Sequence, residues 1–241
     1  MYDEGLNGLV KISQAIGNRP EYVQGGGGNT SAKLGDGLMA IKASGYLISQ
    51  ITTEEGFVAV NYEKILDYYR NDDHTRDVDY DKESIELAVN SIRQIKSEPL
   101  KRPSVEVGFH SVLKRYVIHS HSVYANILSC SAEGTSKINE IMDKTGLDYI
   151  VVPFINPGYP LSLKLINLID ERAKKGLNTD VIFLLNHGLI VTSDSANECI
   201  AINNRVNDLI KNELGLEDFP QPKIRQVSQN AYVSDTAWLA N

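Results

Sequence analysis

Cysteine is scarce in this chain of 241 residues. Its two cysteines, Cys130 and Cys199, lie far apart in unrelated surroundings, and the sequence contains no CxxC pair. This pattern excludes a disulfide framework, which needs several paired cysteines, and it also excludes a zinc site made of thiolates. We therefore expect a protein of the reducing cytoplasm.

Basic charge is also in short supply. The 24 Lys and Arg residues are outnumbered by 31 Asp and Glu residues, which gives a formal net charge of -7. We expect no nucleic acid as the main partner, because binding a phosphate backbone requires a surplus of clustered cations. Any anionic substrate must therefore be met by a few local groups.

Long apolar runs are missing as well. Nowhere do about 18 apolar residues follow one another, which is the length that a membrane-spanning helix requires. The N-terminal MYDEGLNGL is acidic and interrupted by glycines, whereas an export signal has a basic start and an apolar stretch. We expect neither a membrane span nor an export signal.

Enough apolar sequence is present for a sizeable core, since 42% of the residues are hydrophobic. We expect one domain over 1–241, with its core at about 5–214 and an irregular tail at about 217–241. Apolar residues at helical spacing predict helices at 4–16, 61–70, 82–96, 135–144 and 161–174, one that opens at Pro103-Ser104, and one that starts at Ser195. Short apolar runs predict strands at 29–34, 38–43, 116–118, 149–152 and 181–185. Because helices alternate with strands, the predicted fold is a three-layer α/β/α domain.

Two histidines follow directly on the apolar strand predicted at 116–118. His119 and His121 are separated by one residue, and side chains at i and i+2 of a strand leave the same face. The two imidazoles are thus aimed at one point. Catalytic zinc sites take three protein ligands and leave one position open, so a third ligand is needed, and His187 at the end of another buried strand is the best candidate.

Each of these features also has an ordinary structural explanation. The HSH segment could be a polar strand end, His187 a hydrogen-bonded turn histidine, and Glu106 an exposed residue on a helix flank. The run Gly25–Gly28 could be a flexible loop, and it is not a dinucleotide fingerprint, because a strand rather than a helix is predicted after it. The combination of the three histidines with Glu106 favours a metal site.

Five segments in order resemble the class II aldolase/adducin family, which includes fuculose-phosphate and rhamnulose-phosphate aldolases. They are GGGGNTSAK, IKASG, RPSVEVGFH, VIHSHS and LLNHGLIV, and the resemblance runs from about residue 5 to 214. It implies a class II aldolase-like fold. It also implies that His119, His121 and His187 hold one zinc ion, or another divalent metal, per subunit, with Glu106 beside it as acid/base and as a candidate for an extra ligand.

The same resemblance implies a substrate-binding set. The positions that match are Gly28, Asn29, Lys42, Ser44, Gly45 and Ser104. Anion binding there would rely on amides and hydroxyls. Two departures bear on it, since Val105 stands where the aldolases commonly have a hydroxyl and Lys42 adds a cation. Lys42 could bind a phosphate or a carboxylate, or it could be a solvated strand residue.

Tyr159 falls near a tyrosine with which the aldolases protonate the product from a neighbouring subunit, and core packing is an equal explanation for it. The resemblance further implies a homotetramer with sites between subunits.

The implied activity is retro-aldol cleavage of a sugar or sugar-acid phosphate. Breaking a carbon–carbon bond next to a carbonyl leaves an enediolate, and a Lewis acid stabilises that charge. Decarboxylation of a 3-oxo acid phosphate and epimerisation use the same site chemistry and stay open. So does a non-catalytic interaction module of the adducin kind.

Overall fold

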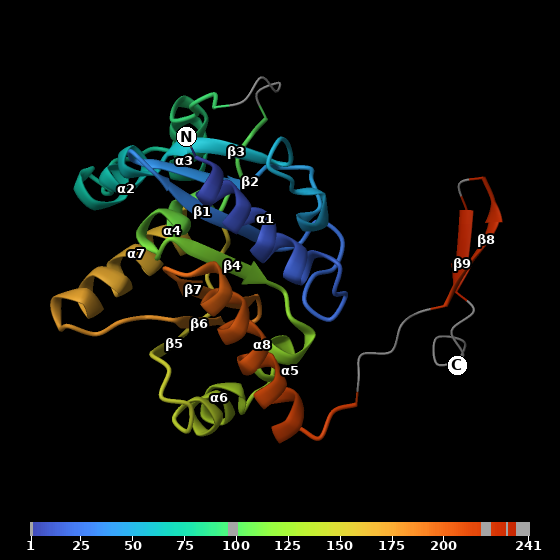
Figure 1. Cartoon of the computed structure of the whole chain (residues 1–241). Coiled ribbons are helices and arrows are strands. Elements are labelled where there is room, and N and C mark those ends of the chain that lie inside the picture. The colour runs from blue at the N-terminus through green and yellow to red at the C-terminus, as the bar shows by residue number, and fades with distance from the viewer. Residues whose placement is uncertain (1, 96–100, 218–222, 230, 235–241) are drawn as a thin grey trace.

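A seven-stranded sheet forms the middle layer of the protein, whose computed structural model describes residues 2–95, 101–217, 223–229 and 231–234 (Figure 1). In chain order its strands are β1 (Asn29–Gly35), β2 (Leu38–Lys42), β3 (Phe57–Asn61), β4 (Tyr116–Ser120), β5 (Tyr149–Val152), β6 (Val181–Leu184) and β7 (Gly188–Ser193). Across the sheet the order is β3-β2-β1-β4-β7-β6-β5. Neighbours are antiparallel except β5 and β6, so the sheet is mixed.

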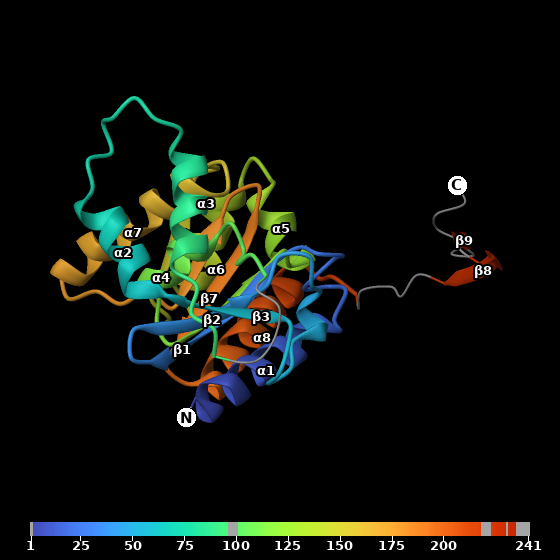
Figure 2. The ribbon, with the colours of Figure 1, turned by 90° about the horizontal axis from the view of Figure 1, so that it is seen from above.

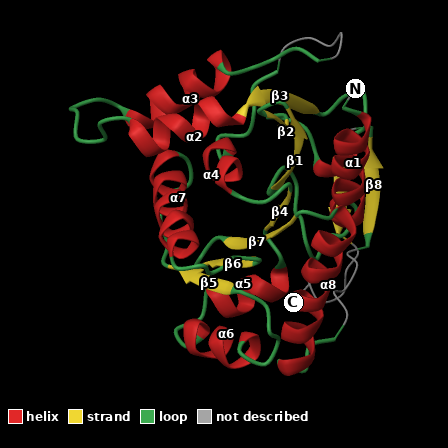
Figure 3. Ribbon diagram, turned by 60° about the vertical axis from the view of Figure 1, so that its left-hand side comes forward, coloured by secondary structure: helices red, strands yellow, loops and turns green. Residues whose placement is uncertain are grey.

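Helices cover both faces of the sheet (Figures 2 and 3). They are α1 (Asp3–Gly17), α2 (Tyr62–Asn71), α3 (Tyr80–Asn90), α4 (Val107–Val112), α5 (Val123–Ser129), α6 (Gly134–Met142), α7 (Tyr159–Lys174), α8 (Ala196–Glu213) and the short 3-10 helix η1 (Ile48–Gln50). Helices α1, α5, α6 and α8 pack on one face, and α2, α3, α4 and α7 pack on the other. The three-layer α/β/α prediction is therefore confirmed. None of the described helices is long and apolar enough to cross a membrane.

The two cores arise from the alternation of side chains along the strands. In β4, Ile118 belongs to the core beneath α1 and α8, whereas its neighbour Val117 belongs to the core beneath α4 and α7. All five residues of β4 are buried, because helices cover both of its faces. A strand that is apolar on both sides places its polar C-terminal end, His119-Ser120, inside the protein.

The predicted hairpin at 29–43 is confirmed, with β1 and β2 paired antiparallel across a tight turn. Within residues 1–217, the elements β3, β7, α5 and η1 were not predicted. The helix expected at 82–96 is wrong after Asn90. There Ile92 pairs with Val60 in an isolated bridge, and Arg93 donates its backbone N–H to Ala59 at 2.9 Å, so the chain runs extended along β3. Apolar spacing alone does not distinguish the two, since a residue beside a sheet edge is buried just as a helix residue is.

The irregular tail expected from about residue 217 is also wrong where the chain is described. β8 (Ile224–Ser228) and β9 (Ala231–Ser234) pair antiparallel as a hairpin. All five residues of β8 are exposed. Residues 218–222 and 235–241 of the expected tail lie outside the described residues. That 1–241 form a single domain stays a prediction.

The start of α8 supplies a test of the fold. Ser195 is its N-cap, and its hydroxyl accepts the backbone N–H of Glu198, as the sequence spacing predicts. Ser195→Ala should lower the free energy of unfolding by about 1 kcal/mol, because one backbone donor loses its partner. For a chain of this size that is a fall of roughly 2–4 °C in melting temperature. Ser195→Asn, which keeps a capping oxygen, is the control, and equal losses in both variants would contradict the cap.

Candidate metal and substrate site

His119 and His121 are brought together by the end of β4. His119 is the fourth residue of the strand and is fully buried, and His121 follows its last residue. Their ring centroids lie 5.1 Å apart. The Nδ1–H of His119 donates to the Leu189 carbonyl oxygen at 3.2 Å, which leaves the lone pair on Nε2. A backbone carbonyl that holds one ring nitrogen in this way is typical of metal-binding histidines.

The turn between β6 and β7 delivers His187. Antiparallel pairing brings Leu184 opposite Gly188, so Leu185, Asn186 and His187 form a three-residue turn. Asn186 adopts a left-handed conformation with φ of 56°, and its N–H donates to Ser129 in α5. The His187 ring then lies 5.0 Å from that of His119 and 5.3 Å from that of His121, measured between centroids.

Two glycines allow the chain to approach this cluster. At Gly28, φ is +70°, and a Cβ would lie 2.6 Å from the carbonyl oxygen of His119. At Gly188, a Cβ would lie 2.5 Å from the carbonyl oxygen of Ser120. Both distances are too short for any other residue. The glycine loop and the β6–β7 turn therefore close on β4 from its two sides.

The three histidines suit a metal ion. One ligand nitrogen from each lies within 4.8 Å of the others. Burial lowers the pKa of His119 to about 3 and that of His187 to about 4, with a further contribution from neighbouring imidazoles, and burial also lowers the pKa of His121. All three rings are thus neutral at pH 7, which is the form that binds metals. Neutral imidazoles at this spacing favour zinc and similar divalent ions.

Glu106 lies directly against the cluster. Its Oε2 is 3.4 Å from His119 Nε2, and its Oε1 is 3.4 Å from His187 Nε2. His119 Nε2 and Glu106 Oε1 are buried and have no hydrogen-bond partner among the described residues. Leaving such atoms unpaired costs roughly 1–3 kcal/mol each. A cation among the three imidazoles and the carboxylate would satisfy them, so these residues fit the metal that the sequence implies.

The local structure around Glu106 corrects one expectation. The sequence predicts a helix that opens at Pro103-Ser104, with Glu106 on its flank. Instead α4 begins at Val107 and Glu106 is its N-cap residue, with no capping bond from its side chain. Ser104 organises the turn before the helix, because its carbonyl accepts Val107 N–H at 3.1 Å and its hydroxyl accepts Glu106 N–H at 3.3 Å. The carboxylate is left free to face the histidines.

A cavity of about 310 Å³ opens above this cluster. His121, His187 and Glu106 line it, together with all six residues that the sequence assigns to substrate binding: Gly28, Asn29, Lys42, Ser44, Gly45 and Ser104. The segment before α4 makes this possible. Ser44 N–H donates to Arg102, Ser104 N–H donates to Lys42, and Ala43 bridges Pro103, so the two segments run side by side.

Lys42 is not the solvated strand residue that the sequence left open. It is only 5% exposed, and its Nζ donates to the Tyr46 carbonyl at 2.8 Å. Burial lowers the pKa of the Lys42 ammonium, and the nearby Glu106 carboxylate opposes this shift. Its position places one buried cation in the wall of the cavity.

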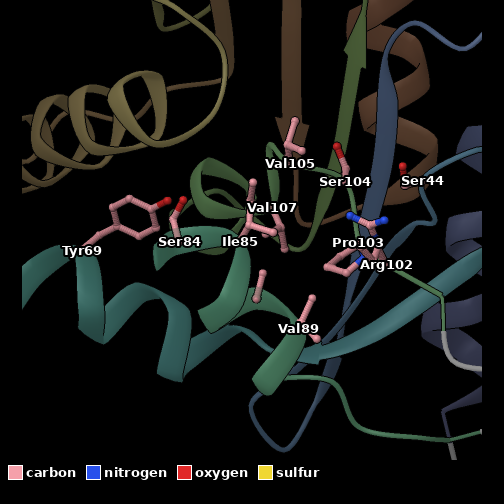
Figure 4. Close-up of a pocket in the computed structure, with 11 residues that line it drawn as sticks. Ser44, Tyr69, Ser84, Ile85, Val89, Arg102, Pro103, Ser104, Val105 and Val107 are labelled. Carbon is pink, nitrogen blue, oxygen red and sulfur yellow. The ribbon is translucent and has the colours of Figure 1, made fainter. Parts of the chain in front are cut away.

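A smaller cavity of about 70 Å³ adjoins the first (Figure 4). The two share Ser44, Ser104 and Val105. The smaller one is lined by Ile85 and Val89 of α3 on one side and by the segment from Arg102 to Val105 on the other. Val105, at the position where the aldolases commonly have a hydroxyl, thus borders both cavities.

Tyr159 is not brought to the site. It is the first residue of α7 and is 8% exposed, and its ring stacks on that of Tyr80 with 4.8 Å between centroids. The rings of Tyr69 and His74 lie against it as well. Burial raises the pKa of Tyr159 to about 12, which keeps its hydroxyl protonated. This environment supports core packing, the other explanation that the sequence offered, and the role of Tyr159 as a proton donor to a neighbouring subunit stays a prediction.

Sequence reasoning missed two buried polar residues next to the site, His110 and Ser31. His110 bonds Asn29 through Nε2 and Ser31 through Nδ1. Burial holds the pKa of His110 well below its usual value, so the ring is neutral. The signal was present in the sequence, since Glu106 and His110 are four residues apart, and Asn29 and Ser31 alternate on one strand face.

Solved structures share this fold. The N-terminal class II aldolase domain of a conserved protein from Thermoplasma acidophilum matches 89% of this chain and 95% of its own length, with 26% identity and a TM-score of 0.72. YgbL from Klebsiella pneumoniae, named as a candidate aldolase/epimerase/decarboxylase, matches 91% of this chain and 93% of its own, with 18% identity and a TM-score of 0.60.

An L-fuculose 1-phosphate aldolase from Glaciozyma antarctica PI12 matches 91% of this chain and 76% of its own, with 13% identity and a TM-score of 0.57. Like that to YgbL, this similarity shows the fold alone. A comparison with curated protein sequences gave no match. The sequence profile of the class II aldolase and adducin N-terminal domain matches residues 7–214, most of the chain. The chain therefore belongs to this family.

Proposed function

We propose that this protein is a zinc-dependent lyase that cleaves a sugar phosphate or sugar-acid phosphate by retro-aldol chemistry. The observation that carries this proposal is the position of Glu106, whose two carboxylate oxygens each lie 3.4 Å from a nitrogen of His119 or His187 at the base of the cavity. A metal-ligand set and a proton-transfer group thus share one site. Both are needed to break a carbon–carbon bond next to a carbonyl.

Each residue of the cavity has a role in this proposal. His119, His121 and His187 would hold the ion, which when bound supplies a Lewis acid for the carbonyl end of the substrate. Glu106 moves the proton to or from the substrate hydroxyl or carbon. Its buried carboxylate is held by Asn29, whose Nδ2–H donates to Oε2 at 2.7 Å.

The other end of the cavity would bind the anionic group. The hydroxyls of Ser44 and Ser104 and the backbone of Gly28 and Gly45 supply donors without charge, and Lys42 supplies the cation. The Asn29 amide also donates to Ser104 at 3.2 Å. The binding end and the reacting end are therefore linked through one side chain.

A second candidate is decarboxylation or epimerisation at the same site. Two residues favour it, namely the buried Lys42, which adds a cation, and Val105, which stands where the aldolases commonly have a hydroxyl. A site with this cation suits a ligand that carries a carboxylate, with or without a phosphate. A screen of ketose phosphates and 3-oxo acid phosphates with the zinc-loaded protein separates these reactions. Release of an aldehyde supports the lyase, and release of carbon dioxide supports the decarboxylase.

A non-catalytic interaction module has less support, because it would have no need of three clustered imidazoles around a buried carboxylate. We further propose that the protein acts in the cytoplasm as a homotetramer, as its family resemblance implies. Light scattering at micromolar concentration tests the assembly. A monomer that retains full activity would contradict it.

The metal set is tested by changing two ligands at once. Purified protein should contain about one zinc, or another divalent ion, per chain, because three neutral imidazoles form an open site. The double variant His119→Ala/His121→Ala should contain almost none, as measured by atomic emission. His74→Ala, which changes a histidine outside the cluster, is the control. Full occupancy in the double variant would remove these two residues from the ligand set.

The lowered pKa values predict how zinc affinity depends on pH. An imidazole with an ordinary pKa of 6.5 would lose roughly 25-fold in affinity between pH 7 and pH 5, because protons compete with the metal. His119 and His187, with pKa values of about 3 and about 4, stay neutral over that range and should lose almost nothing. Competition with a chromophoric chelator measures this. A fall of several hundredfold would show that the two rings titrate normally.

The role of Glu106 is tested with Glu106→Gln, which keeps the shape but removes the carboxylate that accepts a proton. Turnover should fall by roughly 10²- to 10⁴-fold, while zinc content and melting temperature change little. Glu171→Gln on the exposed side of α7 is the matched control and should behave as wild type. Glu106→Gln activity within a factor of about three of wild type, at unchanged zinc content, would refute the acid/base role.

A further inference from the structure

A chain of buried hydrogen bonds leads to Glu106 through Asn29. Ser31 Oγ lies 2.7 Å from His110 Nδ1, His110 Nε2 lies 2.5 Å from Asn29 Oδ1, and Asn29 Nδ2 lies 2.7 Å from Glu106 Oε2. His110 is fully buried, and the other three residues are at most 7% exposed. Among the proposed substrate and metal groups, only Glu106 and Asn29 belong to this chain of bonds.

Two secondary-structure elements interleave to build it. Ser31 and Asn29 are two residues apart on β1 and face the same way, and Glu106 and His110 are four residues apart at the start of α4. Phe109 stacks on the His110 ring, with 4.7 Å between centroids, and fixes its plane. Successive residues along the chain of hydrogen bonds come alternately from β1 and from the start of α4. The bonds therefore hold these two elements in position relative to each other.

The hydrogen bonds can run in one direction only. A carboxylate accepts but cannot donate, so the Asn29 group next to Glu106 must be the amide N–H₂, and the Asn29 oxygen must face His110. That oxygen accepts only, so the proton of the neutral His110 ring sits on Nε2. Nδ1 then carries the lone pair and accepts the hydroxyl proton of Ser31. Every donor has one acceptor, and the order ends at an ionised Glu106.

The alternative arrangement would be costly. With the His110 proton on Nδ1, the bare Nε2 would face the Asn29 oxygen, and Asn29 would have to turn over. Its oxygen would then face the Glu106 carboxylate, and the bond from Asn29 to Ser104 would have to reverse, with the Ser104 hydroxyl as donor. Two acceptors in contact inside a low-dielectric site repel each other strongly. The His110 tautomer therefore determines how Asn29 holds both Glu106 and Ser104.

We propose that His110 is a positioning residue that acts through Asn29 to hold the Glu106 carboxylate against the metal ligands. Asn29 anchors Glu106 Oε2. Glu106 Oε1, on the His187 side, has no hydrogen bond from the described residues. The importance of His110 for turnover rests on the proposed function. The hydrogen-bond order itself does not, and it can be measured in the metal-free protein without a substrate.

The first experiment reads the tautomer directly. Long-range ¹H–¹⁵N correlation spectra of the full chain at pH 7, with His110 assigned by comparison with His110→Gln, should show the proton on Nε2. The Asn29 side-chain amide should exchange slowly with solvent, and this protection should be lost in His110→Leu. A proton on Nδ1, or an Asn29 amide that exchanges equally fast in wild type and His110→Leu, would overturn the proposal whatever the reaction proves to be.

The second experiment compares two substitutions of His110. His110→Leu removes the donor to Asn29, and turnover should fall by roughly 10²-fold, the scale of a displaced catalytic group, with zinc content unchanged and KM within a few-fold. His110→Gln keeps an N–H₂ near the Nε2 position and should recover most of that loss. Ile166→Ala, which empties a buried site on α7, is the control for lost stability alone.

The outcomes separate positioning from packing. If His110 only fills the core, kcat of both His110 variants should follow melting temperature as it does in Ile166→Ala, and His110→Gln should give no rescue. That result overturns the positioning role. If wild-type protein turns over no tested substrate, the proposed function fails, while the tautomer and the Asn29 protection still decide the hydrogen-bond order.

Discussion

The pairing of β4 with β1 on one side and with β7 on the other is the constraint on which the site depends. In this register Asn29 lies opposite His119, and His119 lies opposite Ile190, three residues after His187. A shift by one residue would move every side chain of the strand to the other face of the sheet. The ligand set and the residue that holds the acid/base are thus positioned by backbone hydrogen bonds of the sheet.

Burial then determines the chemistry of the groups that the sheet brings together. Desolvation keeps the imidazoles of His119 and His187 neutral, since a charged form would lose its hydration with little compensation. Glu106 stands among them as a single carboxylate, held by Asn29 and facing two ring nitrogens. Neutral ligands with one carboxylate form a site that a divalent cation completes, and this explains why buried acceptor atoms are tolerated there.

Much of this could be predicted from the sequence, because the signals are local. The spacing of His119 and His121 after an apolar strand predicts that their side chains lie on one face. Gly188 after His187 predicts a turn at the end of another strand. Strand order and register could not be predicted, since they depend on contacts between distant segments. The start of α4 was misplaced because the Ser104 turn resembles an N-cap. The packing of Tyr159 could not be predicted because its partners, Tyr69, Tyr80 and His74, come from distant parts of the sequence.

The two ends of the cavity are under different constraints. At the metal end, His119, Asn29 and Glu106 are buried. Replacing any one of them alone would leave a polar group of a neighbouring residue unpaired. At the other end, Val105 is 57% exposed and borders both cavities, so its side chain can change without disturbing the core. Under the proposed function, we therefore expect the reaction chemistry to depend on the sheet and the substrate choice to depend on the short segment 102–105, which lies beside Lys42 and Ser44.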